Sequence, residues 1–243
     1  GISRKQSVKK MINLEKGQNA KINMDIFLVG LGWDVNEDES SGYDFDLDVS
    51  AFLIGENKKT PTEEYLVFYN SENRIKWPDK NQKFVKWDKT LDFVRCNNET
   101  GSPFRSNEAM RQESRPVDPD LSVVGSIDDE DGLTSEDGDD EIMDINLSKV
   151  KQEIKEIVIT VSIHKWKERR QNFGQVERAY VRLYKPGQAD GEGEYIYDLT
   201  EDFSTCASVE FCRLYRRGSE WKIQALGVGH KGGLEELINK YIY

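Results

Sequence analysis

The chain has 243 residues, of which 37% are hydrophobic and 33% charged, and its formal net charge at pH 7 is −11. No apolar run approaches the roughly 18 residues of a membrane-spanning helix, so we expect no membrane span. The N-terminus lacks the apolar core of a secretory signal, and three cysteines without CxxC spacing argue against a disulfide framework or a zinc site, so we expect a cytoplasmic protein.

Short segments of β-strand composition, separated by turns rich in Gly, Asn and Ser, make up most of the chain. Within one of them, Ile157, Ile159, Val161 and Ile163 recur at every second position, which is typical of a strand with one face toward a core. In chain order the segments are 12–24, 26–34, 45–54, 65–70, 141–150, 153–166, 176–185, 193–200, 208–217 and 221–229.

The C-terminus has a helical pattern, in which Leu234, Leu237, Ile238 and Tyr241 recur at helical spacing. Strands of this number and spacing predict an all-β fold, namely a two-sheet antiparallel β-sandwich with a short C-terminal helix. We expect residues 1–243 to form a single domain.

Residues 74–127 break the strand pattern and predict an insertion between two sandwich strands. The first part is basic with interleaved aromatic residues. The second is polar, holds three of the six prolines and has no sustained period, so we expect a short ordered piece followed by a flexible arm.

Lysines interleaved with aromatic residues are suited to gripping a nucleic-acid backbone or another partner. Alternatively, the aromatic side chains pack on the sandwich, and the lysines face water or pair with the acidic loop. The net negative charge of the chain disfavours nucleic acid as a partner. The residues concerned are Lys76, Trp77, Lys83, Lys86 and Trp87.

One segment carries the whole charge imbalance. Between Pro116 and Ser148 there are twelve Asp or Glu and no Lys or Arg, which leaves 33 acids against 34 Lys and Arg in the rest of the chain. A local block of charge indicates a local function rather than general solubility.

Asp44, Asp46 and Asp48 alternate with apolar residues at the start of a strand pattern. Alternate strand residues project from one face about 6–7 Å apart, so these carboxylates repel one another unless they face solvent or share a cation. A second acidic cluster, 128–141, has the composition of a loop, and Ca²⁺ takes about six to eight oxygen ligands from carboxylates and loop carbonyls. Solvent exposure and a cation site both stay open here, and neither cluster has the spacing of an EF-hand.

Five motifs occur in the order of the tellurium-resistance TerD domain family, which the chain resembles over about 12–73 and 128–243. They are GLGWD (30–34), FDLDVSAFLI (45–54), YLVFYN (65–70), DGLTSEDGDDEIMDINLSKV (131–150) and WKIQALGVGHKGGLEELINKY (221–241). The resemblance implies a β-sandwich without catalysis that binds one or two Ca²⁺ ions at its acidic loops. It also implies a link to tellurite and stress resistance and to phage defence, with other stress or resistance proteins as partners.

The resemblance further implies a ligand set, drawn from the paired strand aspartates, the acids of the loop and its GDDE-type end. These residues are Asp46, Asp48, Asp131, Glu136, Asp139, Asp140 and Glu141. Additional candidates are Asp34, which also suits a turn cap, Asp44, Asp129 and the backbone carbonyl of Leu133.

The loop departs from the family pattern at two positions and in its length. Gly132 stands where the family has Asn, Ser135 stands where it has Gly, and one glycine is missing before Asp137. One oxygen ligand is therefore lost, and Asp129 or Glu130 would have to replace it.

No sequence pattern predicts an enzyme. The glycine-rich stretch 227–234 has neither the P-loop nor the dinucleotide pattern and is typical of tight packing before a helix, and the two histidines stand in separate segments. Two functions remain open. The first is a non-enzymatic calcium-binding module. The second is an interaction domain whose metal loop is degenerate and whose insertion binds a protein or nucleic acid.

Overall fold

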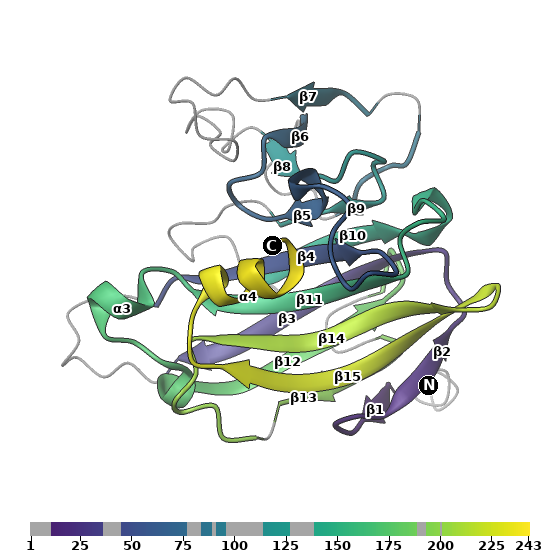
Figure 1. Cartoon of the computed structure of the whole chain (residues 1–243). Coiled ribbons are helices and arrows are strands. Elements are labelled where there is room, and N and C mark those ends of the chain that lie inside the picture. Colours follow the sequence, from purple (N-terminus) through teal and green to yellow (C-terminus); the bar gives the residue numbers. More distant parts are fainter. Residues whose placement is uncertain are drawn as a thin grey trace, which may run out of the picture.

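The computed structural model describes residues 11–35, 45–76, 84–88, 91–95, 114–126, 139–188, 193–199 and 201–243. Within these residues the chain forms two six-stranded sheets, packed face to face, with a three-stranded sheet beside them (Figure 1). The predicted sandwich and C-terminal helix are confirmed.

Each sheet of the sandwich draws its strands from both halves of the chain. Sheet A contains β1 (Ile12–Leu14), β3 (Ile26–Val35), β9 (Val123–Val124), β10 (Glu141–Asn146), β12 (Val176–Tyr184) and β13 (Tyr195–Asp198). Sheet B contains β2 (Asn19–Ile22), β4 (Leu47–Ile54), β5 (Leu66–Val67), β11 (Glu156–Ile163), β14 (Ser208–Arg217) and β15 (Glu220–His230).

The strand order is β1-β13-β12-β3-β10-β9 in sheet A and β2-β15-β14-β11-β4-β5 in sheet B. All these neighbours are antiparallel except β1, which pairs with β13 in parallel. Because β1 and β2 follow one another in the chain but lie at the edges of different sheets, the N-terminal segment joins the two sheets along one side.

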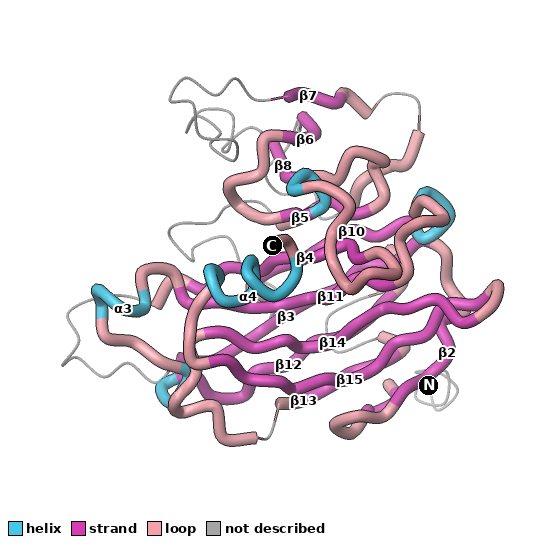
Figure 2. The backbone as a smooth tube through the Cα atoms, in the orientation of Figure 1, coloured by secondary structure: helices cyan, strands magenta, loops and turns pink. Residues whose placement is uncertain are grey.

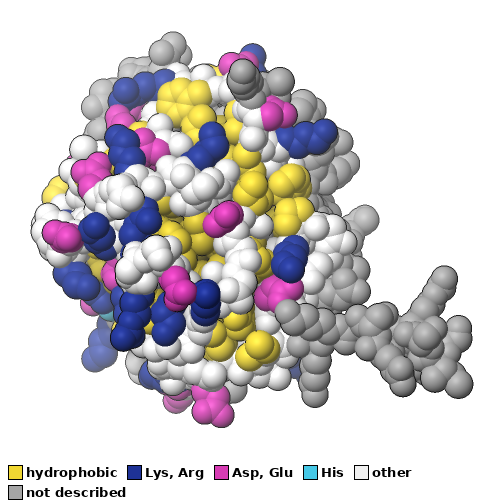
Figure 3. Space-filling model, turned by 90° about the vertical axis from the view of Figure 1, so that its right-hand side faces the viewer, with side chains coloured by type: hydrophobic (Ala, Val, Ile, Leu, Met, Phe, Trp, Pro, Cys, Tyr) yellow, Lys and Arg dark blue, Asp and Glu magenta, His cyan; other side chains and the backbone are white. Residues whose placement is uncertain are grey.

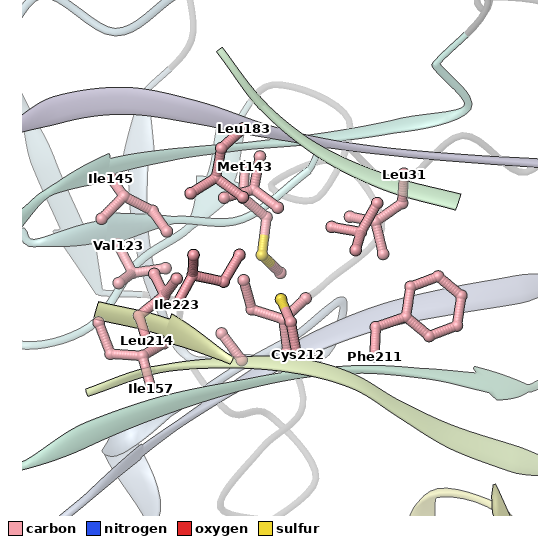
Figure 4. Packing of buried hydrophobic residues seen from close by; sticks show 14 of the residues in the cluster. Leu31, Val123, Met143, Ile145, Ile157, Leu183, Phe211, Cys212, Leu214 and Ile223 are labelled. Carbon is pink, nitrogen blue, oxygen red and sulfur yellow. The ribbon is translucent and has the colours of Figure 1, made fainter. Parts of the chain in front are cut away.

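The main core lies between the sheets (Figure 4). Leu31, Met143 and Leu183 of sheet A point toward Leu214 and Ile223 of sheet B, and all five are at most 1% exposed. Burial of such a side chain contributes about 1.5–3 kcal/mol, so this layer supplies most of the favourable free energy of folding. The four apolar positions predicted to alternate in β11 all belong to this core.

The outer face of sheet B is covered in part by α4 (Leu234–Tyr241), as Figure 1 shows. Leu237 and Tyr241 of α4 pack with Val158 of β11 and Phe52 of β4, so β11 is buried on both faces. The C-terminal end of the helix is capped by Lys59, whose Nζ lies 2.5–3.4 Å from three backbone carbonyls of residues 239–243.

A buried carboxylate also ties α4 to the sheet. Glu210 of β14 is 1% exposed and accepts contacts from His230 Nε2 at 2.7 Å, Lys240 Nζ at 2.8 Å and the Tyr241 hydroxyl. Burial opposes the ionisation of Glu210, but these three donors outweigh it and lower the pKa to about 2.

The third sheet has the order β7-β6-β8 and comes from the region predicted as an insertion. Its strands are β6 (Asn73–Lys76), β7 (Phe93–Arg95) and β8 (Ser114–Pro116). Ile75, Val85, Val117 and Val124 form a small separate core beneath it. The part expected to be an irregular arm thus contains strands, which at three residues or fewer are too short to show a period in the sequence.

Within the described ranges, the other helical elements are single turns between strands (Figure 2). They are α3 (Trp166–Arg169), η2 (Glu63–Tyr65), η3 (Leu147–Lys149) and η4 (Phe173–Gln175). None of the helices within the described ranges has the length and apolarity needed to span a bilayer.

Candidate functional site

The candidate carboxylates that the structure describes lie at one end of the sandwich, where β3 finishes and β4, β10 and β12 start (Figure 1). We call this the acidic end. In sheet A, β10 begins opposite Leu31 and β12 pairs Glu177 with Asp34. In sheet B, the N–H of His164 donates to the carbonyl of Asp46 at 2.8 Å. The candidate ligands found here are Asp34, Asp46, Asp48, Asp139, Asp140 and Glu141.

The opposite end, at the β14–β15 turn, has a different surface (Figure 3). A band of hydrophobic side chains runs down this face, with Lys and Arg gathered beside it and acidic side chains scattered singly. The acidic end, where the candidate carboxylates gather, is therefore the candidate metal site.

Asp139 is built into the fold. Its carboxylate accepts from Arg182 Nε at 3.0 Å on both oxygens, from Arg182 Nη2 at 2.6 Å and from the Tyr180 hydroxyl at 2.7 Å. The side chains of Asp139 and Arg182 are 2% and 5% exposed. Burial and the nearby carboxylate raise the pKa of Tyr180, which keeps its hydroxyl protonated as a donor.

Two glycines of the GLGWD motif make room for this arrangement. A Cβ on Gly30 would overlap the Asp139 carboxylate, and one on Gly32 would overlap the Tyr180 ring. The alternating glycines of β3 therefore let the side chains of Asp139, just before β10, and Tyr180, in β12, lie across its backbone.

Asp140 and Glu141 follow at the start of β10. One Asp140 oxygen accepts the N–H of Trp33 at 2.8 Å, and the Asp140 N–H donates to the carbonyl of Leu31 at the same distance. Asp140 thus fastens the first residues of β10 to the end of β3. Both carboxylates are half-buried, so they remain within reach of solvent or an ion.

Asp46 and Asp48 lie at the start of β4 and are half-buried. Asp48 Oδ2 is 3.5 Å from Nδ1 of His164, which follows β11. The Asp48 contact, with a smaller contribution from Asp46, raises the pKa of His164 above its ordinary value despite partial burial. Two carboxylates that attract a proton to a neighbouring imidazole also have the charge and the oxygen donors that suit a hard cation.

Asp34 is the most exposed of these acids. Its side chain is 63% exposed and lies 3.7 Å from Arg178, which is more exposed still. A pair of this kind contributes little to stability, which makes Asp34 a useful control position.

The remaining predicted ligands lie outside the described residues. They are Asp44, Asp129, Asp131, Glu136 and the carbonyl of Leu133. Among the residues that the structure does describe, no group of three or more His, Cys, Asp and Glu is arranged to hold a metal.

Other members of the acidic block have structural roles. Asp118 is fully buried and accepts the N–H groups of Asp120, Ser122 and Val123 at 2.6–3.0 Å, so it shapes a tight turn. Asp144 is fully buried beside Arg115, with 2.7 Å between their charged atoms. The acidic block is therefore not a single cluster, because parts of it stabilise the fold.

The predicted partner residues of the insertion are only partly described, since Trp77 and Lys83 lie outside the described ranges. Trp87 packs against the small core, whereas Lys86 is exposed and Lys76 is 65% exposed and 3.7 Å from Asp92. For these residues the arrangement fits aromatic packing with lysines in water.

The basic and hydroxyl partners of the acids were not predicted from the sequence. Tyr180 and Arg182 stand two positions apart in a predicted strand, so they share one face, and this was the available signal. For His164 and Arg115 no pattern indicated a partner, because their acids are far away in the chain.

Known proteins resemble this chain over most of its length. The family model of the TerD domain matches residues 11–81 and 114–241, so β7 lies in the unmatched range between them. Tellurium resistance protein TerD of Serratia marcescens is 35% identical over 236 residues, covering 95% of this chain and 96% of the relative. General stress protein 16U of Bacillus subtilis (strain 168) is 32% identical over 235 residues, covering 95% and 96%.

A crystal structure of a protein of unknown function is similar in fold, with a TM-score of 0.50 and 15% identity over 91% of this chain and 100% of that one. That likeness concerns the architecture alone. The two matched ranges of the TerD domain, together with relatives at about one third identity along nearly the whole chain, establish the family: this chain belongs to the TerD domain family.

Proposed function

We propose that this protein is a calcium-binding module without catalytic activity, which acts in the cytoplasm in resistance to tellurite or other stress, phage attack included. Membership of the TerD family and the names of its relatives, which include tellurium resistance and general stress proteins, support the resistance role. The observation that carries the calcium proposal is the pair Asp46 and Asp48, half-buried at the acidic end, the same end of the sandwich at which β10 begins with its own acids.

The candidate ligands that the structure describes are of the chemical type that Ca²⁺ prefers. They are carboxylate oxygens on the ends of rigid strands, and Ca²⁺ prefers oxygen ligands in a flexible geometry. Asp46 and Asp48 would hold the ion, with Glu141 and the acids implied by the family loop completing its shell. Asp139 is better suited to positioning than to ligation, because Arg182 and Tyr180 already occupy both of its oxygens.

Such an ion would act on stability and on surface shape. It would neutralise carboxylates that otherwise repel one another, and it would do so only in the folded chain, which brings them together. An ion bound only by the folded state stabilises it by about 4 kcal/mol at a thousandfold excess over its dissociation constant. The ordered acidic end would then be the surface offered to other resistance or stress proteins.

The test is a thermal melt of chelator-treated protein, with Ca²⁺ or Mg²⁺ added at fixed ionic strength. We expect a large rise in Tm with Ca²⁺ and a smaller one with Mg²⁺, which requires compact octahedral geometry and retains its waters. The variant Asp46→Asn with Asp48→Asn should lose most of the response, whereas the exposed control Glu220→Gln, at the β14–β15 turn, should keep it. An equal response in the double variant and the wild type would disprove this assignment.

A further inference from the structure

Arg115 of β8 makes an unusual set of buried contacts. Its side chain is 2% exposed. Nε donates to the carbonyl of Gly125 at 2.7 Å, Nη2 lies 3.4 Å from the carbonyl of Val124 and 3.2 Å from that of Ile142, and Nη1 is 2.7 Å from Asp144 Oδ2. One guanidinium therefore contacts four residues.

These contacts involve residues before and after the connection between β9 and β10. Val124 and Gly125 are at the end of β9, and Ile142 and Asp144 are in β10, which pairs with β9 in an antiparallel manner. Most of the second acidic cluster, residues 128–140, lies between these two strands in the chain. Arg115 thus contacts both the strand that precedes this cluster, β9, and the strand that follows it, β10.

Arg115 also belongs to a different sheet. β8 pairs with β6 in the small sheet, while β9 and β10 belong to sheet A. A second contact also reaches Asp144 of β10: the N–H of Val85, a residue of the small core, donates to Asp144 Oδ1 at 3.1 Å. The small sheet is therefore linked to β10 by buried polar contacts at both oxygens of Asp144.

The planar fork of Arg115 is suited to this task. A guanidinium directs five N–H groups at fixed angles, so it bridges several acceptors at set separations, which the single ammonium of lysine does not do. Gly125 is equally constrained, because a Cβ there would lie 2.7 Å from Pro116 and 3.1 Å from Val67. Arg115 thus adds side-chain contacts from the small sheet to the backbone pairing of β9 with β10.

We infer that Arg115 is a positioning residue for the cation site, and that it couples the small sheet to the affinity of that site. The inference rests on the proposed calcium function. Glu141 and Asp140 directly precede Ile142, so a shift of β10 moves these candidate ligands relative to Asp46 and Asp48 in the other sheet. By linkage, anything that binds the small sheet and shifts β8 would change calcium affinity, and calcium would change the affinity for that partner by the same factor.

The experiment measures the Ca²⁺ dissociation constant by calorimetry, together with the metal-free Tm, for wild type, Arg115→Lys and Arg115→Met with Asp144→Leu. The double variant leaves no charge buried, but it removes the acceptor of the Val85 N–H and the donor to the carbonyls of Gly125 and Ile142, so it is expected to fold with a lowered Tm. We expect at least about tenfold weaker calcium binding in both variants, as for other residues that orient metal ligands. The calcium affinity should fall in both variants, whichever of the two has the lower metal-free Tm.

A destabilised control separates positioning from a loss of stability. Glu210→Gln lowers Tm at the α4 contact, away from β10, and should leave the calcium dissociation constant within about twofold of wild type. If the Arg115 variants also bind calcium within twofold of wild type, the inference is wrong while the proposed function stands. If wild type shows no calcium binding, the proposed function fails and the inference fails with it.

Discussion

The replacement Asp139→Asn tests whether the first acid of the GDDE-type end stabilises the fold. Asp139 and Arg182 are 2% and 5% exposed, and two oxygens receive three donors from two side chains. Asparagine keeps the size and one acceptor but removes the charge that balances the buried guanidinium. Breaking a buried ion pair from one side costs about 3–5 kcal/mol.

This loss is large on the scale of a whole domain, whose stability is commonly about 5–15 kcal/mol. Denaturant unfolding at pH 7 in the presence of a chelator should therefore show a fall of about 3–5 kcal/mol in the free energy of unfolding for Asp139→Asn. The exposed control Asp34→Asn should change it by less than about 0.5 kcal/mol. Replacement of both partners, Asp139→Leu with Arg182→Met, should cost less than the single change because no charge is left buried.

A loss below about 1 kcal/mol in Asp139→Asn would refute this reasoning, since it would mean that the buried pair contributes no more than a surface pair. The same variant also separates anchor from ligand. We expect the metal-free protein to be destabilised by Asp139→Asn, whereas Asp46→Asn with Asp48→Asn should act mainly on the response to calcium.

Three further changes test other parts of the structure. The Glu210 carboxyl has a pKa lowered from 4.5 to about 2, so its ionised form contributes stability that is complete above pH 4.5 and is lost as pH falls toward 2. In denaturant unfolding across that pH range, the free energy of unfolding of the wild type should fall by about 3 kcal/mol more than that of Glu210→Gln. Parallel curves of unfolding free energy against pH for the two proteins would contradict this. Gly32→Ala should displace the Tyr180 ring and lower the unfolding free energy by about 1–3 kcal/mol, and an unchanged denaturation midpoint would show that the ring moves freely. Lys59→Met should remove the cap of α4 and lower stability by about 1 kcal/mol. Relative to wild type, amide exchange should then become faster in α4 than it does in β14.

The sandwich was predictable because its signals are local. The period-two pattern of β11 follows from one face meeting the core, and the helical spacing of Leu234, Leu237, Ile238 and Tyr241 follows from docking on sheet B. The parallel pairing of β1 with β13 was not predictable, since it joins segments about 180 residues apart and leaves no periodic trace. The small sheet was missed because strands of three or four residues are too short to show alternation.

The acids were predictable as a group but not in their individual roles. In sequence Asp139, Asp144 and Asp48 are equivalent carboxylates, and their different environments are set by partners far away in the chain. Arg182 is 43 residues from Asp139, and nothing in either motif signals the pairing. The aspartate of a loop motif becomes an anchor or a candidate ligand according to whether the fold brings a buried cation to it.

The central claim is that Ca²⁺ binds at the acidic end through Asp46 and Asp48. The most direct measurement is a calorimetric titration of chelator-treated protein with CaCl₂ at fixed ionic strength, repeated with Asp46→Asn plus Asp48→Asn. We predict saturable binding of one or two ions to the wild type and loss of that binding in the double variant, with the metal-free fold retained in both. Absence of binding in the wild type, or equal binding in the double variant, would contradict the claim.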